Sequence, residues 1–384
     1  MAIPTSFSSK LPHEQASIFS VMAQKARKHK ALDLSQGYPD FGMDPKLQDL
    51  VYKEMKKGKN QYAPLEGVPA LREQIAQKIH RIHNRSYDDT TEVTVTNGAT
   101  QALYLAITAF VRPKEKVLIL KPAYDSYEPV VTLSGGIPVP IPLKGPDYQI
   151  NWQAIEQNLG PDTRMIILNN PHNPSGRVWT EEEMNKLEHL LKGTQIILLS
   201  DEVYEHLVFD GRKHISASSI PQLADRAIVC ASFGKMFHNT GWKTGYCVAP
   251  QELMKEIHKI HQVNVFCVHH PTQSALAEYL KEPHHYLNLA SLYEAKRDYF
   301  LELIKDSRFQ WIPTQGTYFQ MLNYSSITEE PDTEFAERLV TQHRVSTIPV
   351  SVFNHNRKDW RQVRICFAKE DETLKKAAEV LNKL

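Results

Sequence analysis

The sequence predicts an α/β protein in which a mostly parallel sheet forms a large domain and a smaller α+β domain completes the chain. The chain has 384 residues, which is enough to bury a large core and to divide into more than one domain. Its composition, with 41% hydrophobic and 23% charged residues, is typical of a folded globular protein. From residue 92 onward, short apolar runs alternate with helical patterns, which favours a parallel sheet covered by helices.

The first part of the chain carries few strong periodic signals. A short amphipathic stretch at 18–30 and a strand-like fragment at 32–34 precede a turn-rich loop at 36–41. Helices are then predicted over 44–57 and 69–83. A proline at the first position of the second helix supports that start, because proline lacks the N–H group that a first helical residue leaves unpaired.

Strands and helices alternate over the middle of the chain. Strands are predicted over 92–96, 116–120, 138–142, 164–168, 195–200, 227–231 and 246–249. Helices are predicted over 100–111, 124–133, 180–192 and 252–263. This alternation predicts helices on both faces of the sheet.

The last part of the chain predicts the smaller unit. A helical stretch over 284–305 is followed by a strand at 318–322, a helix at 332–343, strands at 345–348 and 362–367, and a helix at 371–384. We therefore divide the chain into an N-terminal segment of the small domain, 1–45, a large domain, 46–283, and a small C-terminal domain, 284–384.

Composition excludes several classes of function. Forty-five Lys and Arg balance 44 Asp and Glu, so no cationic surplus favours binding to nucleic acid. The apolar runs are too short to cross a bilayer, and residues 1–10 lack the apolar core of a secretory signal. The four cysteines are scattered, which favours a reduced compartment and a cytoplasmic location. Adjacent histidines at 269–270 and 284–285 lack a third ligand in register, so no metal site is predicted.

One lysine lies where an apolar strand ends. Lys235 follows the run 227–230, and its neighbours are the apolar residues Phe233, Met236, Phe237 and Trp242. A solvated surface lysine is the alternative, but a free ammonium group would be costly among these side chains. Such surroundings lower the pKa of a lysine, and the neutral amine is a nucleophile that forms an imine with a carbonyl. Ser232 can donate a hydrogen bond to a phosphate, and Lys243 can neutralise the phosphate charge.

Polar and aromatic residues follow several other strands, at the edge where open α/β sheets bind ligands. Residues 97–100 are small and open a helix, which suits an anion, although they can equally be a plain cap. Tyr124 can stack on a flat ring or belong to the core. Two prolines hold Asn173 in a rigid loop or a simple turn. Asp201 ends an apolar strand and is expected to need a cationic partner, unless it caps the next segment.

The segment 231–246 resembles the Schiff-base segment of fold-type I pyridoxal-phosphate (PLP) aminotransferases, and the whole chain resembles the methionine and kynurenine aminotransferase branch of that family. The resemblance implies the PLP-transferase fold of type I and a lysine, Lys235, that bonds to the cofactor. Lys243 takes the place of a cation that arginine usually supplies, which keeps the charge and loses the bidentate fork. By the same resemblance, Asp201 is expected to pair with the pyridine nitrogen, and Asn173 and Tyr204 to bind the phenolic oxygen.

The resemblance also assigns the remaining contacts. Tyr124 stacks on the ring, and the phosphate is held by Gly98, Ala99, Thr100, Ser232 and Lys243. Tyr62 resembles the tyrosine that reaches the phosphate of the neighbouring subunit, which implies a homodimer with shared active sites. Arg364, in an apolar strand, grips the substrate α-carboxylate beside Asn173 and Gly37; an internal ion pair is the alternative.

The resemblance implies transamination between an L-amino acid and a 2-oxo acid, with Lys235, Asp201 and Tyr204 as the catalytic residues. The side-chain pocket is expected to include Ile18, Tyr38, Tyr62 and Tyr124. No second arginine is evident that could bind the side-chain carboxylate of a dicarboxylic substrate. The favoured substrates are therefore methionine, phenylalanine, tyrosine, histidine or kynurenine, in preference to aspartate. The alternatives are a carbon–sulfur lyase on the same fold, a PLP-sensing domain without turnover, and an α/β enzyme that does not use PLP.

Overall fold

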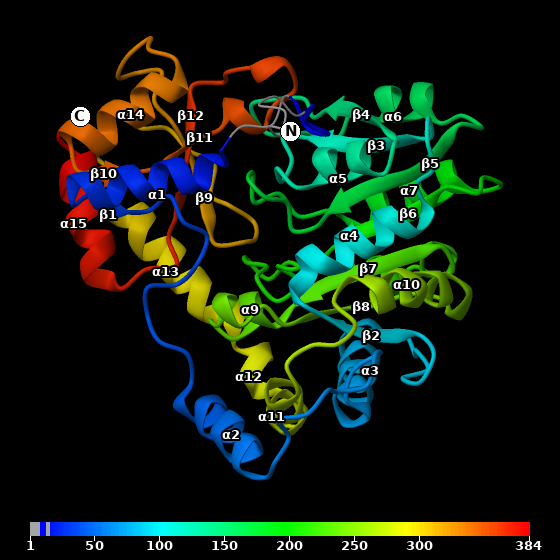
Figure 1. The fold of residues 1–384 in the computed structure, drawn as a ribbon. Helices are drawn as coiled ribbons and strands as arrows, with labels where there is room; N and C mark the ends of the chain where they lie inside the picture. Colours follow the sequence, from blue (N-terminus) through cyan, green and yellow to red (C-terminus); the bar gives the residue numbers. More distant parts are fainter. Residues whose placement is uncertain (1–7, 13–15) are drawn as a thin grey trace, which may run out of the picture.

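The computed structural model describes residues 8–12 and 16–384. The prediction that residues 1–10 carry no secretory signal falls largely outside the described residues. Among those described, no helix has the length and apolar character needed to cross a membrane. Figure 1 shows a large sheet with its helices on one side of the molecule and a smaller group of strands and helices on the other.

The large sheet has seven strands in the order β2-β8-β7-β6-β5-β3-β4. Their bounds are Val93–Thr96 (β2), Lys116–Lys121 (β3), Ile137–Pro142 (β4), Thr163–Asn169 (β5), Ile197–Asp201 (β6), Ala227–Ser232 (β7) and Gly245–Val248 (β8). The pairs β3–β4, β3–β5, β5–β6 and β6–β7 are parallel, which confirms the predicted mostly parallel sheet. Strand β8 is antiparallel to β2 and β7, because the short connection over 233–244 folds straight back onto the sheet.

Helices cover both faces of this sheet. Helix α4 (Gly98–Phe110) packs against β7, β8 and α10 (Gln251–Asn264), and its apolar residues are buried on most sides. The other helices of this part are α2 (Pro45–Lys56), α3 (Pro69–His83), α5 (Tyr127–Leu133), α6 (Trp152–Asn158), α7 (Glu181–Leu191), α8 (Pro221–Ala224), α9 (Phe233–Met236) and α11 (His270–Tyr279). Parallel strands buried in this way bring their carboxyl ends to one edge of the sheet.

The smaller part contains two short sheets. Strands β11 (Ile348–Pro349), β12 (Gln362–Cys366) and β9 (Phe319–Asn323) form an antiparallel sheet, and β1 (Leu32–Asp33) pairs in parallel with β10 (Val345–Ser346). Helices α1 (Ile18–His29), α13 (Leu289–Leu303), α14 (Asp332–Gln342) and α15 (Asp371–Leu381) belong to this side of the chain, whereas α12 (His284–Leu287) lies beside α11. The β1–β10 pair ties the N-terminal segment to the C-terminal part, although the domain limits at 45 and 283 stay predictions.

Several elements differ from the expected ones. The helical stretch predicted over 284–305 is two helices, α12 and α13, that meet at Asn288. Helix α5 starts at Tyr127 and not at 124, because a turn occupies the residues after Pro122. The strand predicted over 345–348 is split between two sheets. Helix α11 was missed, since it is buried on most sides and lacks a clear amphipathic period.

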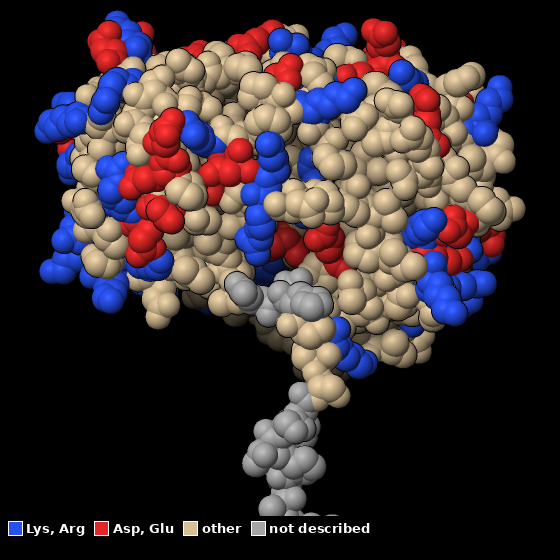
Figure 2. Space-filling model, turned by 90° about the horizontal axis from the view of Figure 1, so that it is seen from above, with Lys and Arg blue, Asp and Glu red and all other residues tan. Residues whose placement is uncertain are grey.

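Charged side chains of both signs are interspersed on the face drawn in Figure 2. That distribution agrees with the net charge of +1. Inside the molecule one ion pair stands out: Lys78 of α3 lies 2.6 Å from the carboxylate of Glu205, and both side chains are at most 5% exposed. Lys78 also donates to the Tyr246 hydroxyl at 2.8 Å.

Replacing Lys78 by methionine tests the weight of this ion pair. Lys78→Met fills the same space but leaves the Glu205 carboxylate buried without its cation, so we expect the free energy of unfolding to fall by about 3–5 kcal/mol. Urea denaturation measures the change. The control Lys255→Met removes an exposed pair with Glu252, which is expected to cost about 1 kcal/mol or less. Equal losses in the two variants would contradict the account.

Candidate active site

A cavity of about 260 Å³ lies at the carboxyl ends of the sheet strands, between the two parts of the chain. Most residues that the sequence singled out line it: Gly37, Tyr38, Gly98, Ala99, Thr100, Tyr124, Asn173, Asp201, Tyr204, Ser232, Lys235, Lys243 and Arg364. They come from segments far apart in the sequence. The fold therefore brings together the groups that strand ends alone suggested.

Two expected residues do not line the cavity of their own chain. Ile18 is partly buried against the apolar core, and the neighbouring Phe19 takes the place expected for it. One position along a helix turns a side chain by about 100°, so a prediction from the sequence alone chose the wrong neighbour. Tyr62 is 79% exposed and packs its ring edge against Phe266, 5.2 Å away between centroids.

An anion-binding corner is formed where α4 begins. Gly98 has a φ of +74°, and a Cβ at this position would lie 3.4 Å from the Lys243 ammonium nitrogen. Ala99 and Thr100 follow in the first turn of α4, where free backbone N–H groups and the helix dipole favour a negative charge. Ser232, at the end of β7, adds a hydroxyl. The donors fit a phosphate group.

Lys235 lies in the single-turn helix α9 and reaches into the cavity. Its Nζ donates to the Gly37 carbonyl at 2.9 Å and lies 5.6 Å from the centre of the Tyr318 ring. Burial lowers the pKa of Lys235 to about 8. A substantial fraction of this amine is therefore neutral just above neutral pH, which is the form that attacks a carbonyl and accepts a proton.

Asp201 ends strand β6 and is 4% exposed. The Tyr127 hydroxyl donates to its Oδ2 at 2.6 Å, and the Val203 N–H donates to Oδ1 at 3.3 Å. Burial raises the pKa of Asp201 to about 6. No lysine or arginine of the described chain forms a salt bridge with this carboxylate, so it is suited to a protonated ring nitrogen bound in the cavity.

Arg364 lies in the middle of β12 and is 1% exposed. Its Nη1 donates to Asn173 Oδ1 at 2.8 Å and its Nη2 to the Ser35 carbonyl at 3.1 Å, while Nε has no hydrogen-bond partner in the part of the chain that the structure describes. The guanidinium lies 3.8 Å from the centre of the Phe319 ring. Burial lowers its pKa to about 10, and it forms no salt bridge within the described residues. A buried cation of this kind is suited to a ligand carboxylate.

Other residues line the cavity that sequence reasoning missed: Phe19, Gln36, Leu103, Tyr127, Asn169, Val203, Thr240 and Phe319. Asn169 could have been found from the sequence, because it directly follows the strand predicted over 164–168. It accepts the Asn173 N–H at 2.7 Å and donates to the Asp201 carbonyl at 2.9 Å. Phe319 and Phe19 reach the site through long-range packing on Arg364, for which the sequence holds no local signal.

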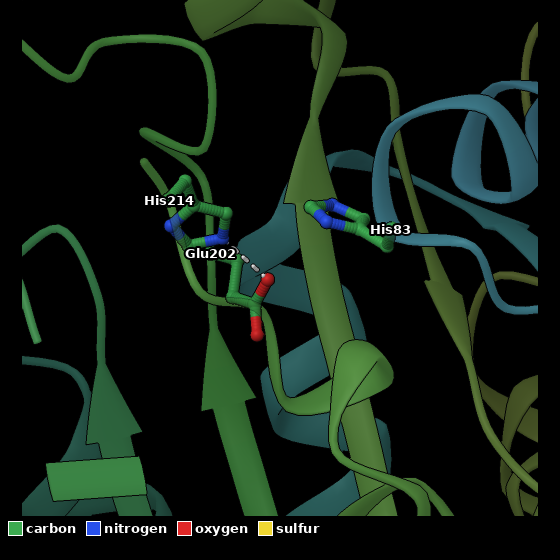
Figure 3. A group of neighbouring side chains, drawn as sticks. All are labelled: His83, Glu202 and His214. Carbon is green, nitrogen blue, oxygen red and sulfur yellow. Dashed lines mark hydrogen bonds and ion pairs between the residues drawn. The ribbon is translucent and has the colours of Figure 1, made fainter. Parts of the chain in front are cut away.

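The residue after Asp201, Glu202, does not line the cavity and lies beside His83 and His214 in a buried polar cluster (Figure 3). Glu202 accepts hydrogen bonds from Ser200, from the Ala217 N–H and from His214 Nε2, at 2.8–2.9 Å. His83 lies near enough for a metal ion to be considered. However, both Glu202 oxygens are already hydrogen-bonded, and His214 Nδ1 lacks, among the described residues, the second partner that a metal-bound histidine usually has. We interpret the cluster as a hydrogen-bonded anchor for the segment that carries Asp201.

Comparison with known proteins identifies the family to which a chain with this cavity belongs. Residues 29–381 match the family model of aminotransferases of class I and II. The chain is 45% identical over 377 residues to a methionine aminotransferase of Escherichia coli, covering 98% of both chains. It is 34% identical to a kynurenine–oxoglutarate transaminase of Rattus norvegicus, covering 91% of this chain and 84% of that one.

Solved structures agree. The crystal structure of YbdL from Escherichia coli, reported with a methionine aminotransferase function, superposes with a TM-score of 0.97 at 44% identity, over 99% of this chain and 100% of that one. An N-succinyldiaminopimelate aminotransferase from Mycobacterium tuberculosis superposes with a TM-score of 0.95 at 33% identity, over 98% and 100% of the two chains. The expected PLP-transferase fold of type I is thereby confirmed.

The lowered pKa of Lys235 predicts a pH-dependent effect on stability. Relative to its ordinary value of 10.5, the lowered pKa means that the folded protein without cofactor disfavours the charged amine below about pH 8. This penalty disappears as the pH rises through the window from about 8 to 10.5. Lys235→Met removes the penalty, so at pH 7 the variant is expected to be more stable by roughly 1–3 kcal/mol.

Urea denaturation of the cofactor-free proteins at pH 7 and pH 10 measures this difference. We expect the advantage of Lys235→Met to be smaller at pH 10. Lys259→Met, a substitution of an exposed lysine, provides the control for the general effect of pH. An advantage that is the same at both pH values would show that the amine is not disfavoured by burial.

Proposed function

The chain belongs to the class I and II aminotransferases and is a PLP-dependent transaminase, and on this premise we propose how its residues share the work and which amino acids it takes. The observation that carries the proposal is that two cations outside the anion-binding corner, Lys235 and Arg364, share one cavity. Lys235 and Arg364 both line it, and neither forms a salt bridge within the described residues. An amine for a carbonyl and a guanidinium for a carboxylate are what an amino-acid substrate requires.

The cofactor site fits PLP on three counts. The corner formed by Gly98, Ala99, Thr100, Ser232 and Lys243 suits the phosphate. The carboxylate of Asp201 lacks a cationic partner among the described side chains and suits the pyridine nitrogen. Tyr124 lines the wall, where its ring can stack, and Asn173 and Tyr204 offer polar groups for the phenolic oxygen. PLP, when bound, supplies a carbonyl carbon that bonds to amines and a ring that accepts electrons.

Proton transfer falls to Lys235. We assign its Nζ, once free, to remove the proton from the substrate Cα and later to return a proton, since its pKa near 8 suits both directions around neutral pH. The Gly37 carbonyl accepts a hydrogen bond from this Nζ at 2.9 Å, and Arg364 lines the same cavity. Arg364 fixes the plane of the α-carboxylate, which aligns the Cα–H bond with Lys235. Tyr204 stays neutral, because burial raises its pKa.

The cavity wall favours donors with apolar or aromatic side chains. Phe19, Leu103 and Phe319 supply apolar surface, and Tyr38 is half exposed at the rim. Arg364 is the only arginine that lines the cavity within the described residues, so no second one awaits a side-chain carboxylate. We therefore propose methionine and aromatic amino acids, kynurenine included, as donors, in line with the relatives' names. A 2-oxo acid is the acceptor.

Assembly and location remain proposals. Tyr62 is exposed and packs against the partly exposed Phe266, and we propose that this surface meets a second copy of the chain, so that Tyr62 reaches the partner's phosphate site. The cytoplasmic location expected from the composition stays a prediction.

Arg364→Lys tests the carboxylate contact. The substitution keeps the charge and loses the bidentate fork. We expect it to cost about 2 kcal/mol of transition-state stabilisation, so that kcat/KM for methionine falls roughly 30-fold. Methionine without its carboxylate, 3-(methylthio)propylamine, is expected to be a poor substrate that the substitution hardly changes. Steady-state kinetics with methionine, phenylalanine, aspartate and this amine measure both claims.

The matched control is Arg297→Lys, which makes the same change in a buried arginine paired with Asp210 away from the cavity. It is expected to leave the ratio of methionine to amine turnover unchanged. If Arg364→Lys lowers methionine and amine turnover alike, the carboxylate site lies elsewhere. Preference for aspartate over methionine in the natural sequence would contradict the proposed donor class.

Complementation tests the dimer. Tyr62→Ala and Lys235→Ala are each expected to be weakly active or inactive, while a mixture of the two forms hybrid dimers with one intact site. Activity that appears on mixing, together with a dimer in sedimentation, is the expected result. A fully active monomer would rule out the shared site.

A further inference from the structure

Tyr127 is a buried side chain that neither the sequence nor the proposed roles account for. It is the first residue of α5, its side chain is 2% exposed, and it lines the cavity. Its hydroxyl donates to Asp201 Oδ2 at 2.6 Å. Its ring stands edge-on to Tyr124, with 5.8 Å between centroids and 80° between planes. One residue therefore contacts the two side chains proposed to hold the cofactor ring.

The hydrogen bond to Asp201 has a fixed direction. A carboxylate only accepts, so the phenol must donate, and burial together with the charge of Asp201 raises the pKa of Tyr127 so that it stays protonated. An O–H···O⁻ contact of 2.6 Å is in the range of charge-assisted hydrogen bonds, which are about twice as strong as neutral ones. The bond also opposes the effect of burial on Asp201, because it lowers the pKa of that carboxyl.

The other contacts of Asp201 show why this bond matters for orientation. Among the described residues, Oδ1 accepts a hydrogen bond only from the Val203 N–H, at 3.3 Å. The backbone of Asp201 is held firmly, because its carbonyl accepts from Asn169 and from the Asn170 N–H. The side chain can still rotate about its own bonds, and within the described residues Tyr127 is the only side chain that hydrogen-bonds to it.

We propose that Tyr127 is a positioning residue that holds the Asp201 carboxylate, in its ionised form, against the pyridine nitrogen of the cofactor. The inference rests on the proposed function. It assigns the hydroxyl of Tyr127 no contact with substrate and no proton transfer. Its effect passes through Asp201, and so it depends on a nitrogen being present in the cofactor ring.

That dependence gives the experiment. Apoenzyme is titrated with PLP and with 1-deaza-PLP, in which a CH group replaces the ring nitrogen, and the two dissociation constants are measured for each variant. Tyr127→Phe keeps the ring and its packing and loses only the hydroxyl. We expect it to weaken PLP about tenfold, the loss of one charge-assisted hydrogen bond, and to leave 1-deaza-PLP unchanged.

Two further proteins complete the design. Tyr87→Phe removes the hydroxyl of another buried tyrosine, one that contacts Ser218 at 3.0 Å away from the cavity, and is expected to change neither constant. In the Asp201→Ala background, Tyr127→Phe is expected to have no further effect on PLP. Equal weakening of PLP and 1-deaza-PLP would overturn the inference, as would an undiminished effect without Asp201.

The failure of the proposed function is recognised separately. Apoenzyme of the natural sequence that binds PLP no more tightly than 1-deaza-PLP would remove the role of Asp201 itself. Natural-sequence apoenzyme that discriminates between the two compounds, together with Tyr127→Phe apoenzyme that discriminates as strongly, would overturn the role of Tyr127 alone.

Discussion

The structure depends on holding two cations, Lys235 and Arg364, beside one cavity with no carboxylate partner for either among the described residues. An isolated charge in a protein interior is expensive, and the chain offsets that cost with neutral acceptors and aromatic faces. Lys235 donates to the Gly37 carbonyl, and Arg364 donates to Asn173 and to the Ser35 carbonyl while lying on the ring of Phe319. The remaining stabilisation has to come from ligands, which makes the cavity a binding site for a carbonyl and a carboxylate together.

This arrangement needs both parts of the chain. The large sheet supplies Lys235, Asp201 and the anion corner at its strand ends, whereas Arg364 and Phe319 come from the small antiparallel sheet. Gly37 lies in the loop after β1, and β1 is paired to β10 of the C-terminal part. The segment 201–205, which begins at the last residue of β6, directs its side chains to two different sites. Asp201 and Tyr204 face the cavity, while Glu202 and Glu205 enter the buried polar cluster with His214 and Lys78.

The sequence predicted the residues of this site well where they directly follow a strand. Asp201, Ser232 and the Gly98 corner each follow a predicted apolar strand, and parallel strands bring such ends together. Prediction failed where the answer depends on packing between distant segments. Phe19 lines the cavity where Ile18 was expected, because of how α1 turns against the core. Tyr127 gave no local signal, since its partner Asp201 lies 74 residues away in the sequence.

Chemical trapping of the cofactor tests the central claim most directly. Borohydride reduction of the holoenzyme fixes PLP permanently to the lysine that holds it, and peptide mass spectrometry then locates the added mass. The account predicts the modification on Lys235, in the segment between β7 and β8. Its presence instead on Lys243 or Lys121, the other lysines near the sheet edge, would contradict the assignment and with it the roles derived for Gly37 and Arg364.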